Sequence, residues 1–175
     1  MRRIFAAFVV LSAAVFMMFG ISSEAQTDAD YSKSLSIDEF SEQLLQKYPG
    51  VEAIKKQFGD EANWRRTTES SPHEEDLELI SNTMEYPGIE IRTMEYTYQG
   101  EDRFFITLTD VTKAGFVTFL GIDIGSSEED VVKNWGSPDE TSSNKLTYNA
   151  LAYSYTVFTI ENNKVARMTY TAPLD

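Results

Sequence analysis

The hydrophobic pattern of this 175-residue chain changes from helical to extended twice, and this change most restricts the folds it can adopt. Apolar residues recur at helical spacing in 36–47 and 51–58, and again in 127–135. Elsewhere they alternate with polar residues, as in strands with one buried face. The expected strands are 77–86, 89–98, 103–111, 116–124, 145–151, 153–161 and 165–171. The sequence therefore predicts an α+β fold rich in antiparallel strands.

Capping and turn residues mark the ends of these segments. The segment 36–39 reads S-x-x-E, a capping-box pattern at a helix start, and Gly59 suits a helix end. The hydroxyls of 126–127 precede the three acids of 128–130, which favours a helix start because hydroxyls cap free N–H groups and acids complement the helix dipole. The dipeptide 162–163, Asn-Asn, suits a two-residue hairpin turn, because Asn tolerates a positive φ.

Two short helical segments match each other at an offset of 77 residues: 52–59 (EAIKKQFG) and 129–136 (EDVVKNWG). Each precedes about three expected strands, which favours a tandem repeat. We therefore expect two helix-plus-antiparallel-meander repeats, 36–112 and 113–175, that form one compact unit with the helices packed on one face of the sheet or sheets. The alternative is two ordinary helices that happen to end in Gly.

The first 25 residues resemble a secretory signal. Arg2 and Arg3 precede an uncharged apolar run, 4–21, and Ser23-Glu24-Ala25 offers small residues before a cleavage point. We expect cleavage after residue 25, a flexible lead-in at 26–35, and an exported protein that is periplasmic or extracellular and is not stably inserted in a membrane. The alternative is an uncleaved anchor, since 18 apolar residues approach the length that spans a bilayer.

Composition excludes several functions. The chain has 15 basic and 28 acidic residues, a formal net charge of −13, and no Cys. An acidic surface repels a phosphate backbone, so we expect no nucleic-acid partner. Without Cys there is no disulfide, thiolate metal site or Cys nucleophile.

No catalytic or metal-binding set stands out. His73, the only His, lies beside three acids, 74–76, in what reads as an exposed acidic loop. Nucleophilic catalysis would need His73 as its base. The acids 128–130 fit helix capping better than general acid catalysis. We therefore expect no enzyme activity, no cofactor and no metal.

The C-terminal third resembles a known module. Segment 121–131 (GIDIGSSEEDV), then 135–138 (WGSP) and 163–170 (NKVARMTY) among Tyr-rich strands, resemble the repeat of the β-lactamase-inhibitor-protein-like fold. Outer-membrane assembly lipoproteins of the SmpA/OmlA type are similar. The resemblance implies their fold and a non-enzymatic, protein-binding function. This chain lacks the acylated Cys of those lipoproteins and the disulfides of the inhibitors, and the resemblance assigns no binding residue.

Aromatic residues provide the candidate site. In 103–111, Phe104, Ile106 and Leu108 alternate onto one face and Phe105 onto the other. The apolar phase of the preceding strand changes near Thr93, which predicts a β-bulge and leaves the facing of the tyrosines that follow it open.

Tyr153 and Tyr155 oppose Phe158 and Ile160 in the same way. An open sheet face with Phe105, Tyr153 and Tyr155 would bind a protein partner, because Tyr is enriched at interface hot spots. Alternatively, these rings pack against the lead-in or the acidic loop. The functional hypothesis is an exported protein-binding module of the bacterial envelope. A periplasmic small-ligand protein with a pocket between helices and sheet is the alternative.

Overall fold

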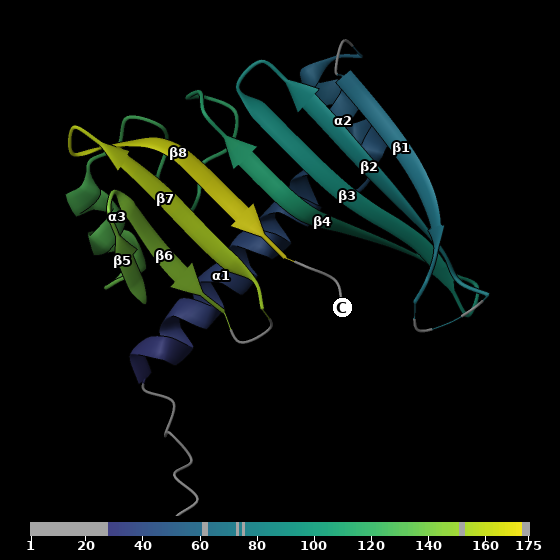
Figure 1. Cartoon of the computed structure of the whole chain (residues 1–175), viewed down its shortest axis with the longest axis horizontal. Coiled ribbons are helices and arrows are strands. Elements are labelled where there is room, and N and C mark those ends of the chain that lie inside the picture. Colours follow the sequence, from purple (N-terminus) through teal and green to yellow (C-terminus); the bar gives the residue numbers. More distant parts are fainter. Residues whose placement is uncertain (1–27, 61–62, 73, 75, 151–152, 173–175) are drawn as a thin grey trace, which may run out of the picture.

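A computed structural model describes residues 28–60, 63–72, 74, 76–150 and 153–172 (Figure 1). The helices are α1 (Asp28–Lys47), α2 (Val51–Phe58) and α3 (Glu128–Trp135). The first strands in the chain are β1 (Asn63–Ser70), β2 (Glu78–Tyr86), β3 (Ile89–Tyr98) and β4 (Glu101–Val111). The later strands are β5 (Glu140–Ser142), β6 (Lys145–Asn149), β7 (Tyr155–Glu161) and β8 (Lys164–Thr171). The expected signal segment, including the apolar run 4–21, lies outside the described residues.

All the described strands belong to one antiparallel sheet, with the order β1-β2-β3-β4-β8-β7-β6-β5. β4 joins β8 in a register that runs from Leu108 opposite Thr171 to Val111 opposite Met168. The expectation of two helix-plus-meander repeats is therefore wrong. The backbone groups of β4 and β8 satisfy each other, so the strands of both halves share one sheet and one core.

The helices pack on one side of this sheet, and α1 crosses it diagonally (Figure 1). Ile37, Phe40, Leu44 and Tyr48 are almost fully buried at helical spacing. The helix begins at Asp28, before the expected capping box at 36–39, which lies inside it. Because the helix continues through Ser36, that capping-box prediction is wrong, and most of the expected lead-in is helical.

Aromatic rings fill the space between α1, α3 and the sheet. Phe40 lies 4.2 Å from Phe119 and 5.3 Å from Tyr170, between ring centroids. Trp135 lies 5.2 Å from Phe158, edge to face, and its Nε1 donates a hydrogen bond to the carbonyl of Phe119 at 3.1 Å. These large side chains leave the described core closely packed.

The segment before α3 differs from the expected strand at 116–124. Val117, Phe119 and Ile122 are buried, but the chain reverses at 120–121, where both residues have positive φ. Phe119 and Ile122 then pair only with each other, in an isolated bridge. The apolar pattern therefore reflects a compact turn pressed into the core rather than an extended strand.

Two strands carry no sequence signal. Every residue of β1 is exposed, so its sequence, NWRRTTES, has no buried face to reveal it. β5 has three residues, all exposed. Other local predictions are confirmed: Ser127 and Asp130 form a capping box at α3, and 162–163 is a turn in which both Asn residues have positive φ.

Candidate functional site

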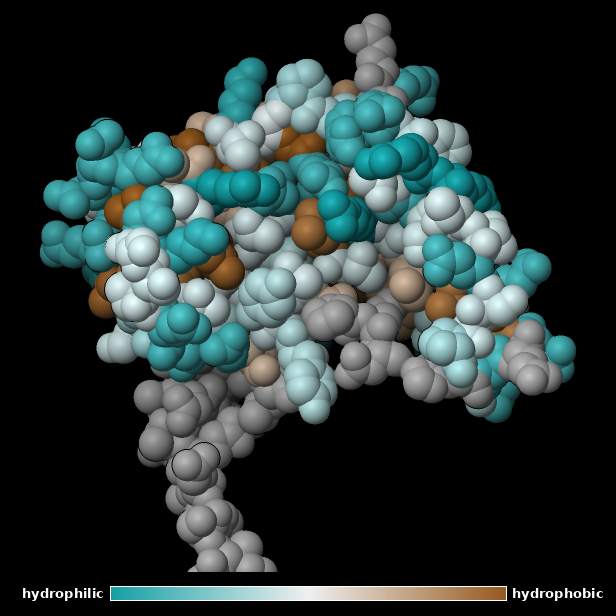
Figure 2. Space-filling view, in the orientation of Figure 1, coloured by the Kyte–Doolittle hydropathy of each residue, from teal (hydrophilic) through white to brown (hydrophobic). Residues whose placement is uncertain are grey.

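The side of the sheet opposite the helices is the candidate site, and we call it the open face. Figure 1 looks onto this face, with the helices behind the strands. In the same view, Figure 2 shows hydrophobic residues as separate patches among hydrophilic ones. No described helix or loop covers this face, and its mixed polar and apolar character resembles that of an ordinary protein interface.

A β-bulge determines which residues reach the open face. The register between β3 and β4 shifts between Arg92, opposite Leu108, and Thr93, opposite Ile106. The shift lies at the predicted level, next to Thr93, but the residue that the pairing skips is Thr107 of β4. The expectation of a bulge within the strand 89–98 is therefore wrong, because β3 itself alternates without interruption. Because of the bulge in β4, Leu108 shares a face with Phe105 rather than with Ile106. The expected grouping of Phe104, Ile106 and Leu108 on one face is wrong for Leu108.

Phe105 is half-buried on the open face and stacks on Tyr96. Their ring centroids lie 5.7 Å apart and their planes are 17° from parallel. The rings come from diagonal positions on neighbouring strands, since Met94 opposes Phe105 and Tyr96 opposes Arg103. Tyr96 lies on this face by the regular alternation of β3, in which Glu90, Arg92, Met94 and Tyr96 share one side.

Tyr155 lies on the open face in the same row as Leu108. It opposes Thr171 of β8, which opposes Leu108 of β4. Its side chain is 37% exposed. Tyr153 is 75% exposed and precedes β7, with a φ of 61°. The structure thus brings Phe105 and Tyr155 to one face and leaves Tyr153 in the connection before β7.

An ion pair lies beside these rings. Asp110 is only 7% exposed, although it is on the open face. Its Oδ1 accepts hydrogen bonds from Arg167 Nε and from Thr169 Oγ1, both at 2.6 Å. The hydrogen bond to Asp110 raises the pKa of Arg167 above its usual value. These residues come from β4 and β8, which are far apart in the sequence, so no local motif predicted the pair. The ion pair places a hydrogen-bonded polar group in the middle of the open face.

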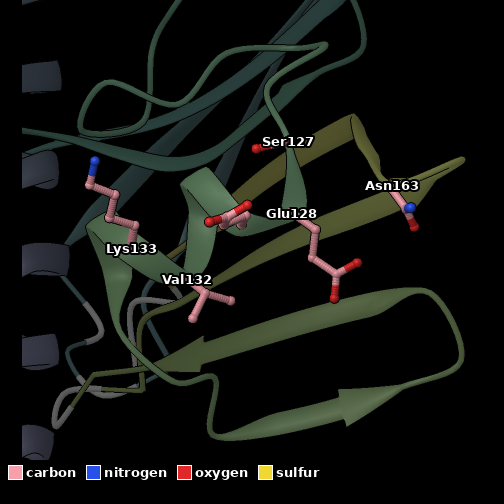
Figure 3. A pocket seen from close by; sticks show the side chains of 6 residues that line it. Ser127, Glu128, Val132, Lys133 and Asn163 are labelled. Carbon is pink, nitrogen blue, oxygen red and sulfur yellow. The ribbon is translucent and has the colours of Figure 1, made fainter.

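A shallow depression of about 650 Å³ lies on the other side of the molecule, over α3 (Figure 3). The residues around it include Ser127, Glu128, Val132 and Lys133, and Figure 3 shows Lys133 and Glu128 on different sides of Val132. Ser127 Oγ donates to Asp130 Oδ2 at 2.6 Å and accepts from the backbone N–H of Asp130. The hydrogen bonds from Ser127 lower the pKa of Asp130. These polar groups are used in capping the helix.

The described residues contain no group of three or more His, Asp or Glu side chains placed to hold a metal ion. His73 lies outside the described residues. Within the described part of the chain, no helix is both long and apolar enough to cross a bilayer.

Comparisons of the chain with protein-family models, curated proteins and solved structures find no match. The residues of the open face are therefore the features that point to a function. Phe105 and Tyr155 were expected there from their alternation. Leu108 and Asp110 join them because of the bulge in β4, and Tyr96 joins them because β3 alternates without interruption.

Proposed function

We propose that the chain is an exported, non-enzymatic module that binds a protein partner through the aromatic part of its open face. The observation that carries this proposal is the row of Leu108 and Tyr155, which no described element covers, beside the stacked rings of Tyr96 and Phe105. Stacked and half-exposed rings give a partner a rigid apolar surface at little cost in side-chain entropy.

The fixed charges support a protein partner over a simple apolar ligand. Asp110 and Arg167 form an ion pair on the same face, and Glu90, which opposes Asp110, pairs with Arg92. Apolar rings bordered by paired charges are typical of the core and rim of a protein interface. The resemblance of 121–170 to protein-binding modules favours the same function, and the net charge of −13 disfavours nucleic acid.

The small-ligand alternative requires a pocket between helices and sheet. In the described core this space holds Phe40, Phe119, Trp135 and Phe158, each at most 2% exposed. Ligand sites are usually concave and preformed, so this packing gives the alternative no support.

Site-specific photocrosslinking tests the proposal. A photoreactive phenylalanine analogue at Tyr155 or Phe105 should crosslink one envelope protein in the native host. The matched control is the same analogue at Val132, an exposed apolar residue on α3. Tyr155→Ala should weaken capture of that protein, and Val132→Ala should not. Equal crosslinking from Val132 and Tyr155, or capture unaffected by both Tyr155→Ala and Phe105→Ala, would overturn the proposed site.

A further inference from the structure

We propose that the chain forms a symmetric dimer in which the outer edge of β1 pairs, antiparallel and centred on Thr67, with the same edge of a second copy. This interface differs from the open face and does not depend on the function proposed for it. It would join two sheets edge to edge into one continuous sheet.

The two edges of the sheet differ in how well they are protected. β5 has three residues, and a short edge strand offers little to pair with. β1 has eight residues, pairs with β2 without a register shift, and contains no Pro. Among the described strands it pairs only with β2. Its outer N–H and C=O groups therefore form a long, regular template for another strand.

The charges of β1 select one symmetric register. A twofold axis perpendicular to the sheet keeps the same face of both copies on one side. Directly opposed residues must then belong to the same face of β1, so the axis lies level with one residue and not between two residues. An axis at Arg66 would oppose Arg66 to itself, and an axis at Arg65 would do the same for Arg65. An axis at Thr67 opposes Arg65 to Glu69 twice and Arg66 to Thr68. Opposite charges directly across a strand pair stabilise it, and like charges destabilise it.

The side chains of β1 are available for this register. Arg65 and Glu69 lie on the same face, since they oppose Thr83 and Leu79 of β2. Arg65 donates to Glu85 Oε1 at 3.0 Å, which leaves further guanidinium donors for a second carboxylate. Glu69 is exposed and has no ion-pair partner within the described residues.

On the other face of β1, Trp64 is held in place. Lys55 Nζ lies 3.8 Å from its ring centroid, and its Nε1 donates to Asn82 Oδ1 at 3.3 Å. The ring is 41% exposed and would lie opposite Ser70 of the second copy. A fixed, exposed Trp adds apolar contact area to the pairing at little entropic cost.

Disulfide trapping tests the geometry, because the chain has no Cys of its own. In the proposed register the two Thr67 Cα atoms lie about 4.5–5.5 Å apart, within the range that a disulfide spans. Thr67→Cys in the full chain should therefore form a covalent dimer on mild oxidation. Thr68→Cys should not form one. In this register Thr68 opposes Arg66, so the two Thr68 residues are displaced by two positions along the strands and their Cα atoms lie about 8 Å apart. Thr141→Cys, on the β5 edge, is the second control.

Charge exchange tests the register by sedimentation velocity. Arg65→Glu or Glu69→Arg should each weaken the dimer by on the order of tenfold, because like charges then face each other twice. The double exchange should recover most of that loss. Arg66→Glu, the same charge change on the next residue, opposes Thr68 and should weaken the dimer much less.

The outcomes separate cleanly. Selective trapping at residue 67, together with recovery in the double exchange, supports the dimer. A monomer at all concentrations, equal trapping at residues 67, 68 and 141, or a dimer indifferent to Arg65→Glu and Glu69→Arg would each overturn it. Circular dichroism of each variant confirms that the sheet is intact, so that a lost dimer is not mistaken for unfolding.

Discussion

Phe105 stacks on Tyr96 across neighbouring strands, with 5.7 Å between their ring centroids, on the side of the sheet that no described helix covers. A pair in the core would be enclosed by other rings. This pair is half-buried, so its free surface is available to a partner. Removing a half-buried ring should cost less free energy of unfolding than removing an enclosed one.

Phe105→Ala should therefore cost about 1–2 kcal/mol in the free energy of unfolding, because the variant loses a ring stack and only part of a buried ring. Phe158→Ala, in the core against Trp135 and Tyr148, should cost about 3–5 kcal/mol. Urea unfolding of both variants gives the comparison. Equal losses would mean that Phe105 is enclosed rather than open.

Asp110 provides a second prediction, because two donors share its Oδ1. Asp110→Ala should lower the free energy of unfolding by about 1–2 kcal/mol, since it leaves Thr169 and Arg167 without their acceptor and Arg167 is partly exposed. Glu101→Ala removes the carboxylate of the more exposed Arg103–Glu101 pair and should have almost no effect. Thermal or urea unfolding of both variants measures the two losses of stability. Equal losses would contradict the prediction.

Two buried Tyr residues should respond differently to loss of their hydroxyl. Tyr148 Oη donates to the carbonyl of Gly136 at 3.0 Å, so Tyr148→Phe should cost about 1 kcal/mol. The hydroxyl of Tyr48 is buried and finds no acceptor among the described residues. Tyr48→Phe should therefore be neutral or slightly stabilising. A larger loss for Tyr48→Phe than for Tyr148→Phe in urea unfolding would show that Tyr48 has a partner.

The same Tyr pair predicts alkaline unfolding. Burial raises the pKa of Tyr48 and of Tyr148 to about 12, from an ordinary value of 10.0. Above pH 10 the unfolded chain loses these protons while the folded chain keeps them. Their contribution to stability is thus complete below pH 10 and is lost as the pH rises towards 12.

Urea unfolding across this pH range, followed with tyrosinate absorbance, measures the loss. Tyr148→Phe should flatten the dependence, because it removes one of the two titrations. Tyr155→Phe is the control, since Tyr155 is exposed on the open face. An identical pH dependence in Tyr148→Phe and Tyr155→Phe would contradict the assignment.

The elements that could be predicted from the sequence have a periodic buried face and a capping or turn residue at their ends. α3 has its cap at Ser127, and the hairpin of β7 and β8 has its turn at 162–163. β1 could not be predicted, because a strand exposed on both faces has no period. The segment 116–124 has the period of a strand, but positive φ at Leu120 and Gly121 turns it back on itself.

The site was predicted in part for the same reason. The alternation of β7 predicted that Tyr155 and Phe158 lie on different faces of the sheet. The structure agrees, because β7 is regular between these two residues. Leu108 changes face because the bulge lies at Thr107, and a pattern cannot give the position of a bulge to one residue. The joining of two halves into one sheet depends on pairing between β4 and β8, which no local signal encodes.

The pairing of β4 with β8 also affects the order in which the strands of the sheet form. Asp110 bonds to partners 57 and 59 residues away, and β8 is the last of the described strands in the chain. During synthesis from the N-terminus, β1 to β4 can form from local hairpins, while the edge of β4 that pairs with β8 stays unpaired until β8 has been made. Because this pairing joins residues far apart in the sequence, we expect it to be a slow step. Loss of the chain from Met168 onward would therefore leave β4 with an unpaired edge in the middle of the sheet.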